Sequence, residues 1–521
     1  MRTEHPLTYT SLLDNDALHR EYEQALERVA RELGHHYPMY INGRRVAAIE
    51  EFEIRSPIDA NITIGTFQKG GPKEAQSAIE AAAASFLTWG HTDWRARVDT
   101  MRTIAASVER DASDLAALIT YEVGKNRFEA LAEVYEAVAM LRYNCDVYEA
   151  HNGFVTPMAR ITGEQSVSVM KPFGAWAVIS PFNFPLVLAA GMLSAALLTG
   201  NTVVFKPTSK APLTGLKLYT ICVKDGIPGG VLNIITGPGE PFGEVVTKHR
   251  DVAGIAFTGS HAAGAWLQRA FENSQSYIKP FIGEMGSKNP VIVTARAEID
   301  AAAEGVIKAA FGYGGQKCSA ASRVYVERSV ASEFIDRLRT RSEALTVGDP
   351  RRRDVVVGPL IDLGAREKFE RAITDAQDGG GTVIAGGTVL HGGLHDRGGY
   401  VRPTVITGLS RTHRLFVEEL FVPLVVVDTV SSLEEGIEQA NATDYGLTAG
   451  IFSQDEEEVE RFFASMNFGV CYANRRGGAT TGAWPGVQAF GGWKASGSTG
   501  KGVGGPYYLL SYVREQTQTR A

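Results

Sequence analysis

The sequence has few cysteines, and their placement excludes two broad classes of protein. Only four occur in 521 residues, at Cys145, Cys222, Cys318 and Cys471. Small secreted proteins that depend on disulfides carry cysteine at far higher density, so we expect four free thiols in a reducing compartment. None of the four forms a CxxC pair or a cluster with histidine. We therefore expect no metal site.

The sequence also lacks a long apolar run and a strong excess of charge. Residues 1–6 do not begin a signal-like segment, and the longest apolar stretch, 184–198, is short for a membrane span. A net charge of −7 gives no general attraction to nucleic acid or anionic membranes. We expect a cytoplasmic globular protein of two or three domains that binds neither nucleic acid nor membrane.

Glycine, by contrast, is abundant, with 56 residues. From residue 174, apolar strand patterns alternate with helical ones, and a second such set begins after residue 284. This alternation is typical of α/β proteins with doubly wound parallel sheets, which bind ligands at the carboxyl ends of their strands. Strands are predicted at 40–46, 175–180, 202–206, 231–236, 254–258, 290–293, 322–327, 382–385, 424–427, 449–452 and 470–473. Helices are predicted at 11–36, 72–87, 94–111, 112–123, 127–149, 187–198, 213–223, 241–249, 261–272, 299–310, 331–343, 363–377 and 432–441.

Two segments fit poorly into either set. Residues 153–171 alternate polar and apolar side chains and indicate a hairpin, and residues 506–513 indicate an apolar strand near the end of the chain. An unpaired terminal strand promotes aggregation, so we expect it to pair with another element. One use for such a hairpin is to reach a partner subunit, and the exposed edge of the strand favours the same interpretation, so we expect a homo-oligomer of unspecified size.

One loop stands out chemically. Residues 311–321 run Phe311-Gly-Tyr-Gly-Gly-Gln-Lys-Cys-Ser-Ala-Ala321, between a predicted helix and a predicted strand. Glycines let a ligand approach the backbone closely, and a cysteine in such a loop is a candidate nucleophile. The alternative is a buried structural thiol, since free cysteine is among the most buried residue types. The glycine-rich surroundings favour the nucleophile.

Several strand ends carry groups suited to a cofactor. Gly237-Pro-Gly239-Glu-Pro-Phe-Gly243 follows a strand and is similar to a dinucleotide fingerprint with one residue too many, although a tight turn accounts for it equally. Phe257-Thr-Gly-Ser260 opens a helix and offers backbone N–H groups to phosphate. Lys206 and Asn183 end two further strands; a solvated lysine and a turn-capping amide are their alternatives.

Taken together, these motifs resemble the aldehyde dehydrogenase family from about residue 40 to the end. The matching pieces occur in the family's order: Pro181-Phe-Asn-Phe-Pro185, Phe205-Lys-Pro207, Phe257-Thr-Gly-Ser260, Gly283-Glu-Met-Gly-Ser-Lys-Asn-Pro290, Gly314-Gly-Gln-Lys-Cys318, Glu418-Glu-Leu-Phe421 and Phe490-Gly-Gly492. The resemblance implies a dinucleotide-binding domain at 1–152 and 172–284 and a catalytic domain at 285–480. The segments 153–171 and 498–521 would serve oligomerisation.

The resemblance also implies a role for each matching residue. Cys318 would attack an aldehyde carbonyl as thiolate, Asn183 would hold the oxyanion, and Glu284 would activate water for thioester hydrolysis. Lys206 and Glu419 would hold the two riboses of NAD or NADP, and Gly259 and Ser260 would lie beside the pyrophosphate. The predicted cofactor residues are Ser180, Pro181, Phe182, Lys206, Ser209, Gly239, Phe257, Gly259, Ser260, Glu284, Glu419 and Phe421.

A narrower resemblance is to the 1-pyrroline-5-carboxylate, or glutamate γ-semialdehyde, dehydrogenase branch. Lys317-Cys-Ser319, Thr481-Gly-Ala483, the run from Gly486 to Gly492 and the ending Gly504-Gly-Pro-Tyr-Tyr508 carry it. It implies oxidation of the semialdehyde to glutamate in proline degradation. The substrate residues would be Lys317, Ser319, Gly482, Ala483 and Phe490. A hydroxyl and two successive backbone N–H groups suit a carboxylate.

Three departures leave alternatives open. Trp484 and Pro485 are bulkier than the branch pattern, so another aldehyde, bulky or aromatic, stays possible. Ser209 stands where an acid often selects NAD, so NADP use is open. Val422 replaces a usual glycine and puts the placement of Glu419 in question. A non-catalytic protein on the same fold and a Cys–His hydrolase are the alternatives of other kinds. The intact catalytic residues disfavour the former, and the histidine contexts disfavour the latter.

Overall fold

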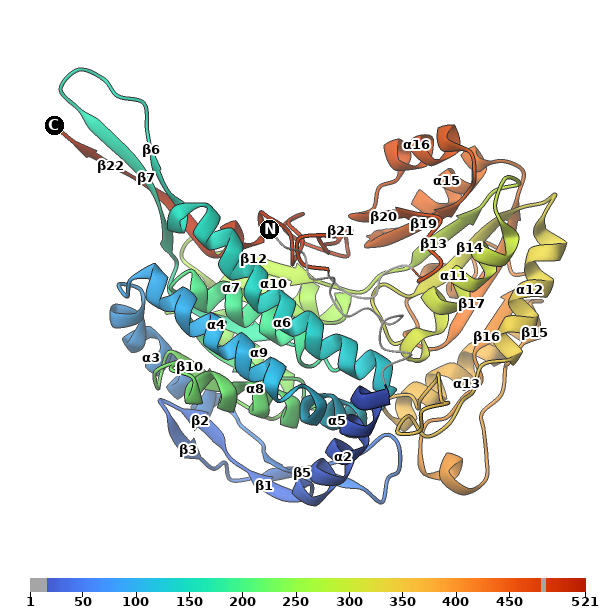
Figure 1. Cartoon of the computed structure of the whole chain (residues 1–521), viewed down its shortest axis with the longest axis horizontal. Helices are drawn as coiled ribbons and strands as arrows, with labels where there is room; N and C mark the ends of the chain where they lie inside the picture. Colours follow the sequence, from blue (N-terminus) through green and yellow to red (C-terminus); the bar gives the residue numbers. More distant parts are fainter. Residues whose placement is uncertain (1–15, 479–483) are drawn as a thin grey trace.

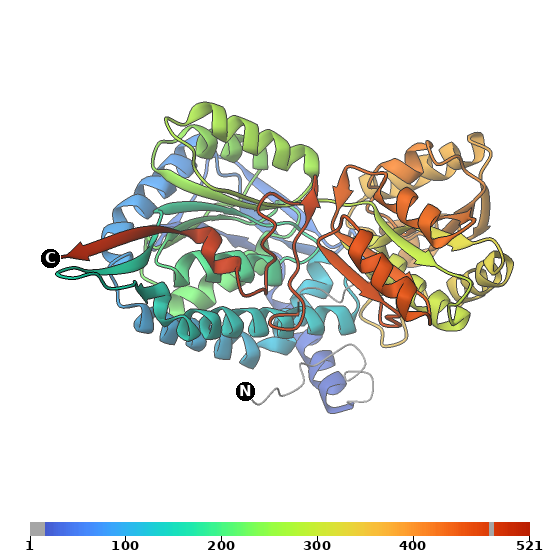
Figure 2. The same ribbon diagram turned by 90° about the horizontal axis from the view of Figure 1, so that it is seen from above.

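Parallel pairing of apolar strands builds two large sheets, as the alternation of strand and helix patterns predicts. The computed structural model describes residues 16–478 and 484–521. Figures 1 and 2 show two lobes side by side, each centred on one seven-stranded sheet, with the C-terminal segment returning to the first lobe. In the part of the chain described, no helix is both long and apolar enough to cross a membrane.

The sheet of the first lobe has the strand order β12-β11-β8-β9-β10-β2-β3. Its strands are β2 (Met39–Ile41), β3 (Arg44–Val46), β8 (Ala175–Ile179), β9 (Thr202–Lys206), β10 (Leu232–Ile234), β11 (Val252–Thr258) and β12 (Phe281–Glu284). β2 and β3 pair antiparallel at one edge, whereas β8 to β12 pair parallel. The carboxyl ends of the parallel strands therefore meet along one border, where ligands of such sheets bind.

Helices cover both faces of this sheet. They are α2 (Asp16–Glu32), α3 (Pro72–Trp89), α4 (Trp94–Arg110), α5 (Ala112–Val123), α6 (Arg127–Ala150), α7 (Val187–Leu198), α8 (Pro212–Lys224), α9 (Gly239–Lys248) and α10 (His261–Ser274). On β8, Trp176 and Val178 join one apolar cluster while Ala175 and Ala177 join another on the opposite face. Successive strand residues point to opposite faces, so burial on both sides explains why these strands are apolar throughout.

The second lobe repeats this plan with the strand order β15-β16-β17-β14-β13-β19-β20. Its strands are β13 (Asn289–Val293), β14 (Ala321–Glu327), β15 (Thr382–Ala385), β16 (Thr404–Thr407), β17 (Leu424–Val430), β19 (Thr448–Phe452) and β20 (Val470–Ala473). Its helices are α11 (Ile299–Phe311), α12 (Ala331–Glu343), α13 (Leu363–Asp378), α14 (Arg414–Val417), α15 (Leu433–Asn441) and α16 (Glu456–Ser465). Strand β16 and helices α14 and α16 have no counterpart among the predicted elements.

Smaller sheets complete the chain. They comprise β1 (His35–Tyr37), β4 (Glu51–Arg55) and β5 (Thr63–Gln68) in one sheet, β18 (Tyr445–Gly446) with β21 (Trp493–Lys494) in another, and β6 (Val155–Pro157), β7 (Gln165–Pro172) and β22 (Val513–Arg520) in a third. The last of these, which we call the arm, projects from the first lobe (Figure 1). The predicted hairpin at 153–171 corresponds to β6 and β7, which pair antiparallel.

The prediction of an apolar strand at 506–513 is wrong. Tyr508–Tyr512 forms a short 3-10 helix, in which the Tyr508 and Tyr512 hydroxyls lie 2.9 Å apart and both side chains are buried. The strand begins only at Val513, is polar and exposed, and pairs with β7 of the same chain over eight residues. The apolar side chains are needed for packing into the lobe, whereas the arm strand is held by its backbone ladder to β7 and by polar side chains, such as Ser166 with Thr519 at 2.8 Å.

Asn201 joins the arm to the first lobe. Its side chain is fully buried, accepts the N–H groups of Phe173 (2.8 Å) and Gly174 (3.0 Å), and donates to the Tyr512 carbonyl (2.9 Å). These bonds connect the segments that precede β8, β9 and β22.

Asn201→Ala is expected to destabilise the protein by several kcal/mol, because each buried polar group left without a partner costs about 1–3 kcal/mol. Thermal or urea unfolding followed by circular dichroism measures the loss. Asn61→Ala, at an exposed position, serves as the control and should change stability by less than about 0.5 kcal/mol. Equal midpoints for the two variants would contradict the role given to Asn201.

Candidate active site

A cavity of about 640 Å³ lies at the carboxyl ends of β8, β9 and β11, with second-lobe residues on its far side. It is lined by Cys318, Asn183 and Glu284, the three predicted catalytic residues. The twelve predicted cofactor residues line it as well: Ser180, Pro181, Phe182, Lys206, Ser209, Gly239, Phe257, Gly259, Ser260, Glu284, Glu419 and Phe421. The structure therefore brings both sets together from segments far apart in the sequence, while their individual roles stay predictions.

Lys206 is the last residue of β9, and its side chain is almost fully buried. Its Nζ donates to the Pro207 carbonyl at 2.8 Å. Burial lowers the pKa of Lys206 to about 7. An ammonium that is held by one backbone carbonyl in a ligand-sized cavity keeps donors free for the hydroxyls of a ribose.

Two helix N-termini open on the same cavity. Ser260 caps α10, its hydroxyl accepting the Ala263 N–H at 3.4 Å, and α9 begins at Gly239. A Cβ on Gly239 would meet nothing within 4 Å, so this helix end is open to a ligand. Partial positive charge and unpaired N–H groups at helix N-termini suit a pyrophosphate.

A neighbouring cavity of about 370 Å³ continues from this one, because both are lined by Ile179, Lys206, Gly239, Phe257 and Ala263. Its other lining residues are Glu240, Phe242, Trp266 and Leu267, most of which are apolar. An apolar slot beside two helix N-termini and a buried lysine fits the adenine, pyrophosphate and ribose of a dinucleotide. The residues present therefore fit NAD or NADP.

The loop before Cys318 has a backbone conformation with positive φ, which few residues other than glycine adopt. Tyr313, Gly314 and Gly315 have φ values of 49°, 60° and 68°, in the left-handed region. The Tyr313 hydroxyl donates to the Val123 carbonyl at 2.6 Å, and the Asn289 amide donates to the Cys318 carbonyl at 2.7 Å. These bonds fix the backbone on both sides of the thiol.

The Cys318 side chain is partly exposed to the cavity, and its surroundings favour the thiol. Burial raises its pKa to about 12, and the negative charges of Glu419 and Glu284 act in the same direction. The Ser319 backbone N–H opposes this shift. The thiolate that attacks a carbonyl must therefore form by loss of the proton to a base or to water during the reaction.

Glu284 is the last residue of β12 and lines the same cavity as Cys318. Its Oε2 accepts the Gly492 N–H at 3.1 Å, and burial raises its pKa to about 8. A further cavity of about 20 Å³ is lined by Glu284, Cys318, Phe490 and Tyr508. This volume is enough for one water molecule, so a carboxyl with a near-neutral pKa meets both the thiol and space for water.

Glu419 lines the cavity, although Val422 stands where the family usually has a glycine. Its Oε1 accepts the Ser287 N–H at 2.8 Å, and burial raises its pKa to about 7. A Cβ on Gly286 would overlap this carboxyl, so Gly286 allows Glu419 to approach.

The predicted substrate residues are only partly brought together. Phe490 lies with Cys318 in the smaller cavity. Ser319 is buried beside Cys318, and the Lys317 Nζ bonds to Glu129 at 2.7 Å in the protein interior. Gly482 and Ala483 lie outside the described residues.

Sequence reasoning missed several residues of the site. Lys368 from α13 and Tyr445 from β18 also line the larger cavity, and isolated polar residues on distant elements carry no signal that would reveal this. Gly492 belongs to the recognised motif Phe490-Gly-Gly492, but nothing in the sequence indicates that its backbone N–H binds Glu284. The buried glutamates of α6 were not recognised either, because the sequence indicates only a helix at 127–149.

Comparison with known proteins decides the family. The aldehyde dehydrogenase family model matches residues 45–518. The chain belongs to the aldehyde dehydrogenase family. The expected family and fold class are thereby confirmed.

Curated relatives match this aldehyde dehydrogenase over nearly its whole length. The 1-pyrroline-5-carboxylate dehydrogenase of Bacillus pumilus (strain SAFR-032) is 35% identical over 505 residues, covering 96% of this chain and 95% of the relative. The 1-pyrroline-5-carboxylate dehydrogenase 2 of Bacillus subtilis (strain 168) is 35% identical over 503 residues, 95% of each.

Solved structures agree. A mutant 1-pyrroline-5-carboxylate dehydrogenase from Thermus thermophilus has a TM-score of 0.94 at 34% identity, covering 100% of this chain and 99% of that one. The Thermus enzyme with bound NAD has a TM-score of 0.93 at 34% identity and the same coverage. Betaine aldehyde dehydrogenase from Staphylococcus aureus in complex with NAD+ has a TM-score of 0.89 at 27% identity, with 96% and 97% covered.

Gly315→Ala is expected to abolish most of the dehydrogenase activity, because the added Cβ would lie 2.5 Å from the Val422 carbonyl oxygen and displace the Cys318 loop. Gly314→Ala is the matched control: its φ is similarly positive at 60°, but its Cβ meets nothing closer than 3.7 Å. The control carries only the backbone strain of about 1–3 kcal/mol. Aldehyde-dependent NADH formation compares the two; equal losses would show that the contact with Val422 does not matter.

Proposed function

We propose that this aldehyde dehydrogenase oxidises L-glutamate γ-semialdehyde, the open form of 1-pyrroline-5-carboxylate, to L-glutamate. The observation that carries the proposal is the position of Cys318 and Glu284, which line both the dinucleotide-sized cavity and the small cavity with Phe490. The names of its relatives at 33–35% identity support the substrate. The reaction belongs to proline degradation.

In the proposed mechanism, the Cys318 Sγ attacks the aldehyde carbon and forms a tetrahedral adduct. The Asn183 amide and the Cys318 backbone N–H donate to its oxygen and stabilise the developing charge. NAD, held by the residues of the larger cavity, would supply the acceptor for the hydride of this carbon. Loss of that hydride leaves an acyl thioester on Cys318. Glu284 then takes a proton from water, which attacks the thioester and releases the carboxylate.

Recognition of the substrate's own carboxylate is assigned to Ser319, Gly482 and Ala483. A hydroxyl and consecutive backbone N–H groups bind an anion without bringing a second charge into the site. Lys317 adds positive charge nearby, although it is shared with Glu129.

The structure weakens the reason for preferring a bulky or aromatic substrate. Trp484 stacks under the Arg475 guanidinium, whose carbon lies 5.0 Å from the ring centroid, and Arg475 also donates to Gln488 at 2.6 Å. Trp484 lines neither cavity beside Cys318. The Trp484 side chain therefore packs against Arg475 and does not narrow the space around Cys318.

We propose NAD as the principal cofactor, with NADP also accepted. Ser209 leaves no carboxylate at its position in the cavity to repel a 2′-phosphate. Lys210 is held by Asp362 at 2.5 Å, so its charge is largely compensated and gives NADP little extra attraction.

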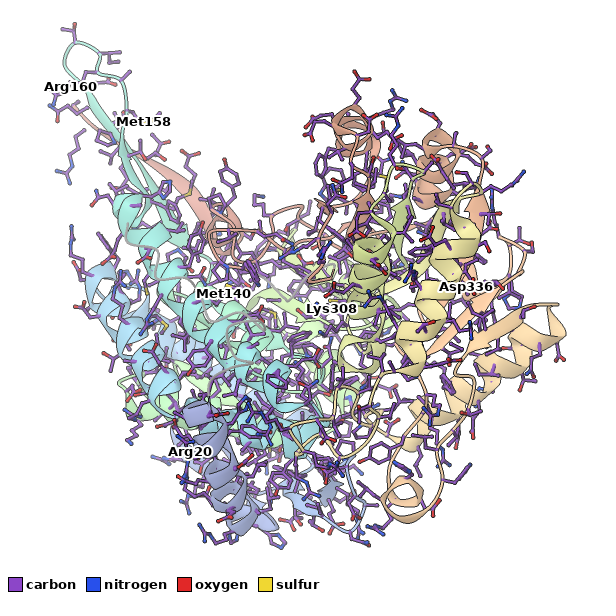
Figure 3. All side chains as sticks on the ribbon, turned by 45° about the vertical axis from the view of Figure 1, so that its right-hand side comes forward. Arg20, Met140, Met158, Arg160, Lys308 and Asp336 are labelled. Carbon is purple, nitrogen blue, oxygen red and sulfur yellow. The ribbon has the colours of Figure 1, made fainter. Side chains whose placement is uncertain are left out.

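We further propose a cytoplasmic homo-oligomer. All four cysteines are free thiols, which fits a reducing compartment. The arm exposes backbone edges and apolar side chains such as Met158 and Ile161, and Figure 3 shows Met158 and Arg160 far out along it. Such an exposed sheet needs a covering surface, which a second copy of the chain would provide.

The semialdehyde is expected to exceed uncharged aldehydes of similar length by about 10²-fold or more in kcat/KM, because charge-assisted hydrogen bonds contribute about 1.5–3 kcal/mol each. Ser319→Ala should narrow this lead. The same variant acting on the uncharged aldehyde is the control and should be nearly unchanged. An uncharged aldehyde that leads in the wild-type enzyme would refute the substrate assignment while leaving the mechanism intact.

The two chemical steps are expected to differ in their dependence on pH. Glu284 accepts a proton only when ionised, so thioester hydrolysis should rise with pH and level off above its pKa of about 8. Formation of the thioester should keep rising, because the pKa of Cys318 is about 12. Stopped-flow measurement of the NADH burst and of the following steady rate separates the steps. In Glu284→Gln the hydrolysis plateau should vanish; its persistence would exclude Glu284 as the base.

A further inference from the structure

The first turns of α6 bury an unusual set of charged side chains. Glu129, Glu133 and Glu136 lie on one side of the helix at spacings of four and three residues, and Lys125 and Lys317 face them. Lys125 and Glu133 are fully buried. The mechanism above uses none of the three glutamates.

Glu133 contacts the segment that carries Asn183. Its Oε1 accepts the backbone N–H groups of Leu186 (2.8 Å) and Val187 (3.2 Å), at the beginning of α7. N–H groups at a helix start have no partner within the helix, and α7 is buried almost throughout, so Glu133 replaces water there. This bond fixes the chain three residues after Asn183.

Lys125 strengthens the same connection. Its Nζ donates to the Glu133 Oε2 at 2.7 Å and lies 3.4 Å from the centroid of the Phe184 ring, next to Asn183. The ammonium thus holds the aromatic side chain and the carboxylate together. A second pair, Lys317 with Glu129 at 2.7 Å, joins α6 to the residue before Cys318.

The charges of this cluster can balance. Two lysines face three glutamates, and burial together with the charge of Glu133 raises the pKa of Glu136 well above its usual range. This shift favours the neutral form of Glu136, and each lysine is paired with one of the other two glutamates. Buried ion pairs contribute little net stability, since their desolvation offsets their attraction, so a cluster of this kind is better explained by what it positions.

We propose that Glu133 is a positioning residue for the oxyanion site: through Leu186 and Val187 it sets the place of the Asn183 amide relative to Cys318. Glu129 does the same for the cysteine loop through Lys317, so one helix aligns the two halves of the site. The inference rests on the proposed function, in which Asn183 stabilises the adduct formed by Cys318.

The test is a double-mutant cycle on the NADH burst, measured with saturating NAD and aldehyde. Asn183→Ala alone should slow the burst about 10²–10³-fold. Glu133→Met, of similar size but without the acceptor, should slow it by roughly 10–100-fold, as a misplacement near 1 Å does. In the Asn183→Ala background, Glu133→Met should add less than about threefold, because the group that it positions is gone.

Two further variants separate positioning from folding. Glu133→Gln keeps an oxygen for both N–H groups but loses the ion pair with Lys125, so it should slow the burst clearly less than Glu133→Met does, with KM for NAD unchanged. Glu122 is the matched control: it is buried on α5 and accepts the N–H groups of Leu213 (2.6 Å) and Thr214 (2.9 Å) at the start of α8. Because Glu122 does not position Asn183, the double variant Glu122→Met/Asn183→Ala should slow the burst by the product of the two single-variant factors.

If the double variant Glu133→Met/Asn183→Ala slows the burst by the product of the two single-variant factors, the inference is overturned, while the proposed mechanism stays in place. If Glu133→Met does not fold, Lys125→Met replaces it in the cycle, and multiplying losses there overturn the inference equally. An undiminished burst in Asn183→Ala alone would instead overturn the role of Asn183 in the proposed function, and this inference with it.

Discussion

Burial of ionisable side chains is the constraint on which this enzyme's site depends. Removal of water raises the pKa of Cys318 to about 12 and of Glu284 to about 8, and lowers that of Lys206 to about 7. Glu284 and Lys206 are thereby held near the point where they can give or take a proton at neutral pH, whereas Cys318 is held as the thiol. Each interaction with a developing charge is also stronger than it would be in water. The two lobes provide this environment because their sheets are themselves covered on both faces.

The same constraint explains why so much of the site is built from backbone. The backbone N–H groups of Gly492 and Ser287 bind Glu284 and Glu419, and the Cys318 backbone carbonyl accepts from the Asn289 side-chain amide. Backbone donors and acceptors satisfy a buried group without adding a charge that must itself be compensated. The two buried ion pairs, Lys125 with Glu133 and Lys317 with Glu129, connect the loops of the site to one helix.

Much of the fold followed from local patterns. The helix at 112–123 and the strand at 202–206 were predicted with the bounds that the structure shows, because a continuous apolar period and a clear end signal coincide there. The terminal segment failed for the opposite reason. Apolar residues 508–512 pack as a turn into the lobe, while the polar residues 513–520 form the strand, since pairing with β7 requires backbone groups and not apolar side chains.

The sequence by itself determined the chemistry of this protein: a cysteine in a glycine-rich loop, a lysine and an asparagine at strand ends, and motifs in a family's order. These are decided by residue type and short spacing, which local reasoning can follow. Only the tertiary structure decided that Cys318, Glu284 and Asn183 meet in one cavity, that Trp484 packs away from it, and that Glu133 reaches the start of α7. Contacts between residues this far apart in the sequence, such as Asn183 and Cys318, depend on how whole lobes pack, and no local pattern records that.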